Sequence, residues 1–120
     1  MSKRFLIISF FLMTITVLAG NYEKVKLKGK LKTVSKSTFQ TQPLEVLLSE
    51  NQLTVNFFDC LGVLKVVVKD ENGKIVFNHT VNTCVTNNVS IDVTNLNSGN
   101  YIIVISDLYG CSVEGEFVID

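Results

Sequence analysis

The sequence is short of the residues that most catalytic and metal sites use. Its 120 residues include one histidine, one proline and three cysteines, and the 11 basic and 11 acidic residues leave no net charge. With no two cysteines at metal-ligand spacing, His79 gives little basis for a zinc site or for a cysteine nucleophile with a histidine base. Glu114 and Glu116 share one face of a strand, a pattern typical of solvated acids. The sequence therefore predicts no enzyme, no cofactor and no metal.

The first 20 residues differ from the rest of the chain. Lys3 and Arg4 provide a short positive start, residues 5–19 are almost all apolar, and residues 17–20 supply small residues for cleavage. This pattern predicts a signal peptide at residues 1–20 and one domain at residues 21–120.

A membrane anchor is the alternative for this leader. The apolar run is shorter than the ~20 residues that span a bilayer, and Ser9, Thr14 and Thr16 interrupt it. A lipoprotein would need a cysteine where Asn21 stands. We therefore expect export to the periplasm or the extracellular medium, with the membrane involved only through the cleaved leader.

Loss of the leader leaves nine of the 11 basic residues against 11 acidic ones, a formal charge of −2. The lysines nearest the new N-terminus alternate with apolar or small residues and read as the solvated side of one edge strand over residues 22–32. A ligand-binding patch is the other reading of these lysines, namely Lys24, Lys26, Lys28, Lys30 and Lys32. Nucleic-acid binding is not indicated, because it normally needs a larger basic surface.

Short apolar or alternating segments separated by turn residues follow along the whole domain. They predict strands at residues 22–32, 52–58, 63–69, 75–81, 89–93, 101–106 and 111–119, with a further apolar segment at 44–48 that begins after the only proline, Pro43. The Asn72–Gly73 pair favours a type I′ hairpin turn. With no helical periodicity after the leader, the pattern indicates an all-β, antiparallel immunoglobulin-like sandwich of seven to eight strands.

The stretch from Leu96 to Ile105 is the strongest strand signal. A turn of Asn, Ser, Gly and Asn leads into Tyr101 and four consecutive β-branched residues, which predicts a central strand buried on both faces. Leu96, Gly99 and Tyr101 have the arrangement of a tyrosine corner, in which the hydroxyl bonds to the preceding backbone.

The order of these elements resembles the small exported proteins of Bacteroidetes known as domain of unknown function 3244. The resemblance covers nearly the whole of residues 21–120 and implies an immunoglobulin-like fold with no established activity and no catalytic residues. A weaker resemblance, through Asp70, Gly73, Leu96, Gly99 and Tyr101, is to the C-terminal sorting domains of type IX secretion cargo, which usually end in a basic segment, unlike residues 117–120 here. The stronger resemblance is carried by Leu53, Val55, Phe57, Gly62, residues 66–68, Asp70, Gly73, Val76, Phe77, Thr80, Val81, Gly99, Tyr101, Gly110 and residues 115–119.

The three cysteines are expected at one end of the sandwich. Alternating strand directions bring the turns that contain Cys60 and Cys111 and the passage that contains Cys84 to the same end. One disulfide is plausible after export, and Cys60 with Cys84 is the preferred pair, with Cys111 on the core-facing side of the last strand. Three unpaired thiols are the alternative.

The outer face of the sheet that contains residues 101–106 is expected to be unusually apolar. A partner surface or a homodimer face would explain it, as would cover by residues 44–48, scattered exposure or a mistaken strand parity. The residues assigned to this face are Val67, Val76, Ile102, Val104 and Val118.

The sequence predicts an exported interaction or structural module of a bacterial envelope or secreted fraction, bound to an unknown protein partner or to itself. A secreted protease inhibitor that presents loops from the rigid sandwich is the alternative. The ligand and the oligomeric state do not follow from the sequence.

Overall fold

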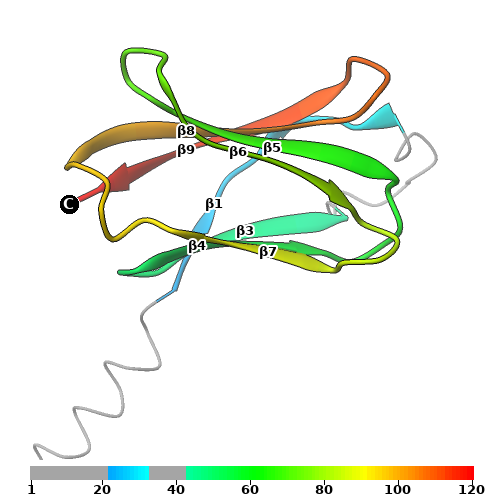
Figure 1. Ribbon diagram of the computed structural model, residues 1–120, viewed down its shortest axis with the longest axis horizontal. Coiled ribbons are helices and arrows are strands. Elements are labelled where there is room, and N and C mark those ends of the chain that lie inside the picture. Colours follow the sequence, from blue (N-terminus) through cyan, green and yellow to red (C-terminus); the bar gives the residue numbers. More distant parts are fainter. Residues whose placement is uncertain (1–21, 33–42) are drawn as a thin grey trace, which may run out of the picture.

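The computed structural model describes residues 22–32 and 43–120, which form two antiparallel β-sheets packed face to face (Figure 1). The expected signal peptide at residues 1–20 lies outside the described residues. The four-stranded sheet has the order β1-β3-β4-β7, with β1 at Glu23–Val25, β3 at Leu44–Leu48, β4 at Gln52–Phe57 and β7 at Asn88–Asp92. The five-stranded sheet has the order β2-β9-β8-β5-β6, with β2 at Lys28–Gly29, β9 at Ser112–Ile119, β8 at Gly99–Ser106, β5 at Val63–Asp70 and β6 at Ile75–Asn82. The predicted all-β immunoglobulin-like sandwich is confirmed.

The core lies between the two sheets and follows from period-two patterning of the strands. In β3 and β4, alternate residues point inward, and Val46, Leu53 and Val55 are fully buried. The inward side of the other sheet supplies Leu64, Val66 and Val68 from β5 and Ile103 and Ile105 from β8, all fully buried. The strand pairing is thereby fixed, because a one-residue slip would turn these side chains outward.

Strand β8 occupies the middle of the five-stranded sheet, between β9 and β5. This is the position predicted from its run of β-branched residues. At its start, the Tyr101 hydroxyl donates a hydrogen bond to the Asn97 carbonyl over 2.7 Å, and the Tyr101 ring stacks on Phe117 with 5.7 Å between centroids. The turn before β8 is thus tied to the strand, with Leu96 packed against the core.

The prediction of one edge strand over residues 22–32 is wrong. The segment crosses from one sheet to the other: β1 pairs with β3, with Lys24 opposite Leu47, and β2 pairs with β9, with Lys28 opposite Glu114 (Figure 1). Gly29, at φ +103°, lies so close to β9 that an added Cβ would collide with the Ser112 carbonyl. Alternation alone could not reveal the switch, because both halves keep alternating polarity on the same side of the sandwich.

The type I′ turn predicted at Asn72–Gly73 is also wrong. A type I′ turn needs positive φ at both central residues, whereas among the described residues only glycines have positive φ, and here that glycine is Gly73, at +84°. The Gly73 N–H donates to the Asp70 carbonyl over 3.0 Å, as in a type I turn followed by a left-handed glycine. Asp70 Oδ1 accepts from the N–H groups of Asn72 and Lys74, both at 2.9 Å, which favours this alternative.

Candidate protein-interaction face

The surface of the five-stranded sheet that points away from the core has an apolar centre. We call this surface the outer face, and it comprises the outward residues of β5, β8 and β9. Ile102 and Val104 are half-buried there, and Val118 is 53% exposed. Val67 is buried but does not belong to the core cluster, because it lies on the outer face opposite Asn78 and Val104. Four apolar side chains therefore gather outside the core.

Charged side chains flank this apolar centre with one sign on each side. Lys65 and Lys69 lie on β5, and Glu114 and Glu116 lie on β9, with β8 between them. The strand register places Lys69, Ile102 and Glu116 in one row across the sheet. The next row contains Val67, Val104 and Glu114. The outer face is consequently basic along one edge, apolar in the middle and acidic along the other edge.

A shallow hollow of about 730 Å³ lies over this surface. Its floor includes Ile102 and Val104, and its sides include Lys69, Glu116 and the turn residue Glu71. The Glu71 carboxylate accepts a hydrogen bond from the Asn100 N–H over 3.3 Å, so the β5–β6 turn contacts the start of β8. An apolar floor with polar sides is the arrangement of a protein-binding surface.

The structure changes one member of the predicted face and removes one explanation for it. A register shift between Val68 and Lys69 places Ile75, 50% exposed, opposite Lys69, while Val76 is half-buried and packs against the core. Ile75 therefore takes the place assigned to Val76. The segment at 44–48, expected as a possible cover, is β3 in the middle of the other sheet and does not lie on the outer face.

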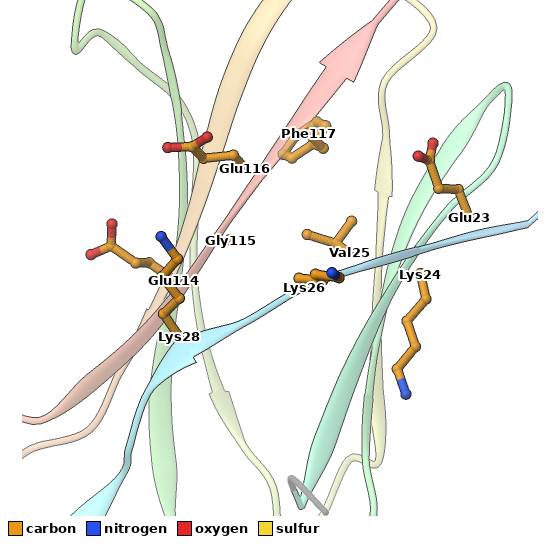
Figure 2. Close-up of a pocket in the computed structure, with 9 residues that line it drawn as sticks. All are labelled: Glu23, Lys24, Val25, Lys26, Lys28, Glu114, Gly115, Glu116 and Phe117. Atoms are coloured by element: carbon orange, nitrogen blue, oxygen red, sulfur yellow. The ribbon is translucent and has the colours of Figure 1, made fainter.

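A second hollow, of about 370 Å³, marks the place where the chain crosses between the sheets (Figure 2). Val25, Gly115 and Phe117 line it, together with charged side chains of β1, β2 and β9. In this view Glu114 and Glu116 point to the opposite side of β9 from Phe117, and the Lys28 side chain runs beside Glu114 (Figure 2). The predicted lysine row is thus divided between two sheets instead of forming one patch.

The cysteine-bearing segments meet at one end of the sandwich. Cys60 and Cys84 form a disulfide with 4.4 Å between their Cα atoms. Beside it, Thr83, the only buried polar residue in the described ranges, accepts from the Leu61 N–H and donates to the Gly62 carbonyl, each over 2.7 Å. Cys111, half-buried just before β9, takes part in no disulfide within the described part of the chain.

The remaining candidates for chemistry do not gather into a site. His79 is exposed on β6, and its ring centroid is 6.2 Å from that of Phe77. Among residues 22–32 and 43–120, no group of three or more His, Cys, Asp or Glu side chains is placed to hold a metal ion. The same residues include no helix that is long and apolar enough to cross a bilayer.

Asp107 is a structural residue that the sequence reasoning missed. Its carboxylate accepts hydrogen bonds from the N–H groups of Lys32 and Tyr109, each over 2.9 Å, and of Cys111 over 3.0 Å. The turn that it organises has the spacing Asp-x-x-Gly, with Gly110 at φ +87°, and Asp70 organises the β5–β6 turn with the same spacing. This repeated spacing is the sequence signal that could have identified both turns.

The Asp107 carboxyl is expected to make stability depend on pH in the acid range. Desolvation raises its pKa, but the N–H groups of Lys32, Cys111 and Tyr109 and the charge of Lys32 outweigh that effect, so the pKa lies below its usual value. A lowered pKa stabilises the fold above the unfolded-state pKa of about 4, and the stabilisation is lost as the pH falls through the folded-state pKa.

Asp107→Asn should therefore cost about 1–2 kcal/mol at pH 7, after allowance for solvent screening, and clearly less near pH 2. Thermal unfolding of both proteins from pH 7 to pH 2 measures this difference. Glu50→Gln, in an exposed turn, is the control. A gap between wild type and Asp107→Asn that stays constant with pH would contradict the expectation.

Comparison with known proteins agrees with the architecture. The family model described as domain of unknown function (DUF3244) matches residues 24–119. A solved structure similar to this chain is the crystal structure of a DUF3244 family protein from Bacteroides vulgatus ATCC 8482, with an immunoglobulin-like β-sandwich fold. It has a TM-score of 0.70 and 16% identity, over 82% of this chain and 99% of the other, which supports the fold alone. No curated protein shows a significant match. Because the family model spans both sheets and nearly all of the described strands, the chain belongs to the DUF3244 family.

Proposed function

We propose that this chain is an exported protein-interaction module of the bacterial envelope or secreted fraction, and that it binds a protein partner through the outer face. The observation that carries the proposal is the apolar centre of that face, where Val67, Ile102, Val104 and Val118 gather outside the core. Contiguous apolar surface rimmed by polar side chains is typical of protein interaction sites.

Two further features support export and binding over catalysis. The Cys60–Cys84 disulfide is the kind of cross-link that persists in oxidising compartments outside the cytosol. The hollow over the outer face is broad and shallow, as expected for contact with another protein surface. The proposal assigns no catalytic role to any residue.

Val104→Lys tests the proposal, because it places a charge at the centre of the outer face. The bait is residues 21–120, which contain both sheets and the whole core cluster, and it is offered to envelope and culture fractions. Ser90→Lys is the matched control, on the exposed side of β7 in the other sheet. We expect proteins retained by wild type and by Ser90→Lys to be lost with Val104→Lys, since burying an unpaired lysine opposes binding.

The unfolding temperature of each variant shows whether the fold is intact. Equal retention of the same proteins by all three baits would overturn the proposal. If Val104→Lys lowers the unfolding temperature, Ile102→Ser, a smaller change in the neighbouring row, repeats the test.

The protease inhibitor alternative has one observation in its favour. Leu108 and Tyr109, at the tip of the β8–β9 turn, are 78% and 67% exposed, and Asp107 holds their backbone. The Lys32 ammonium group lies 5.7 Å from the Tyr109 ring centroid. An inhibitor would form a tight stoichiometric complex with a soluble protease that Leu108→Ala weakens, whereas an envelope module would co-purify with envelope components and leave proteases active.

A further inference from the structure

We propose that the partner of the outer face is a second copy of this chain, related to the first by a twofold axis that runs along β8. This inference rests on the proposed function, because it identifies the occupant of the same surface. It is carried by the order of charges across the sheet.

The outer face is complementary to itself. Lys65 and Lys69 lie on β5 at one side of β8, and Glu114 and Glu116 lie on β9 at the other side. Lys28 of β2 lies opposite Glu114, so Glu116 carries the main negative charge in the row that contains Lys69. A surface with this pattern attracts a copy of itself that arrives with its flanks exchanged.

Symmetry decides which dimer uses this pattern. In a face-to-face dimer, a twofold axis parallel to β8 exchanges the positions of β5 and β9 while each row keeps its place along the strands. Lys69 then faces Glu116 of the second copy, and Ile102 faces its own counterpart near the axis. An axis across the strands would instead set β5 against β5 and β9 against β9, lysine against lysine and glutamate against glutamate. Electrostatics therefore selects the axis along β8.

The apolar residues supply the buried centre of this interface. Ile102, Val104 and Val118, with Val67 beneath, would be covered by the second copy, and the two Lys69–Glu116 pairs would lie at the rim. Sheets that stack face to face usually cross at about 30°, which keeps the central side chains in contact while the rim adjusts. Rim ion pairs also make self-association weaker at high salt.

Charge reversal gives a test with an internal rescue. Lys69→Glu and Glu116→Lys are prepared separately in residues 21–120, and sedimentation equilibrium measures the self-association of each and of their equimolar mixture. Each variant alone should dimerise about tenfold more weakly than wild type or worse, because both rim pairs then join like charges. The mixture should recover near wild-type association, because both pairs in the mixed dimer join opposite charges. Lys24→Glu in β1 and Glu50→Lys in an exposed turn are the matched controls and should dimerise like wild type.

Three outcomes would overturn the inference. They are a wild-type protein that stays monomeric up to about 1 mM, variants that associate like wild type, and a mixture that shows no recovery. The unfolding temperature of each variant at low concentration reports whether its fold is intact. A monomeric wild type would leave the proposed function standing if Val104→Lys still abolished retention of another protein, so the two proposals fail separately.

Discussion

Gly115→Ala is expected to lower the free energy of unfolding by about 3 kcal/mol, at the upper end of the usual cost of overpacking. A Cβ at this position would lie 2.6 Å from the Lys26 carbonyl oxygen and 2.8 Å from Cγ1 of Val25. The nearest atom belongs to the backbone of the segment that crosses between the sheets, so the collision cannot be relieved by a side-chain rotation. Either the crossing segment or β9 must move.

The effect of Gly115→Ala should be purely steric, because Gly115 is not among the glycines with positive φ. Urea unfolding at pH 7 measures the change. Gly73→Ala is an informative comparison, since an added Cβ there meets open space but the φ of +84° is strained for alanine, at a cost of about 1 kcal/mol. A Gly115→Ala protein as stable as wild type would show that Lys26 and Leu27 do not pass over β9.

Removal of the disulfide, as Cys60→Ser with Cys84→Ser, should destabilise the domain by about 3 kcal/mol. The cross-link joins residues 24 apart in sequence, so its loss frees a loop of that length in the unfolded chain. The native fold should persist, because the two bonds of Thr83 to Leu61 and Gly62 still hold the same segments together. Cys111→Ser, which leaves the disulfide intact, should have a small effect by comparison.

Urea unfolding of the two serine variants and of the reduced wild type measures this loss. Denatured oxidised protein should also titrate as one free thiol per chain, which is Cys111. Three titratable thiols, or equal stability of wild type and the double variant, would contradict the disulfide.

The sequence alone was sufficient where a local pattern has one physical solution. Alternating apolar residues in segments such as residues 52–58 and 63–69 can be buried only as strands of a sandwich, and both became β4 and β5 with boundaries within a residue. The four β-branched residues after Tyr101 require cover on both sides, and β8 lies in the middle of its sheet. The all-β class was determined in this way.

Local patterns were insufficient where two segments far apart in sequence constrain each other. The lysine alternation of residues 22–32 suits one strand or two, and only the close approach at Gly29 and Gly115 shows that the segment divides between the sheets. The turn at Asn72–Gly73 has type I′ composition, but the Asp70 carboxylate favours another turn. Ile75 entered the outer face through a bulge whose position depends on pairing with β5.

The candidate site divides in the same way. Strand parity by itself determined that Val67, Ile102, Val104 and Val118 point away from the core, because side chains alternate along a strand whatever its partners are. Only the tertiary structure decided which residues stand beside each other across β5, β8 and β9. That register, a long-range property that no local pattern encodes, placed lysines on one flank and glutamates on the other.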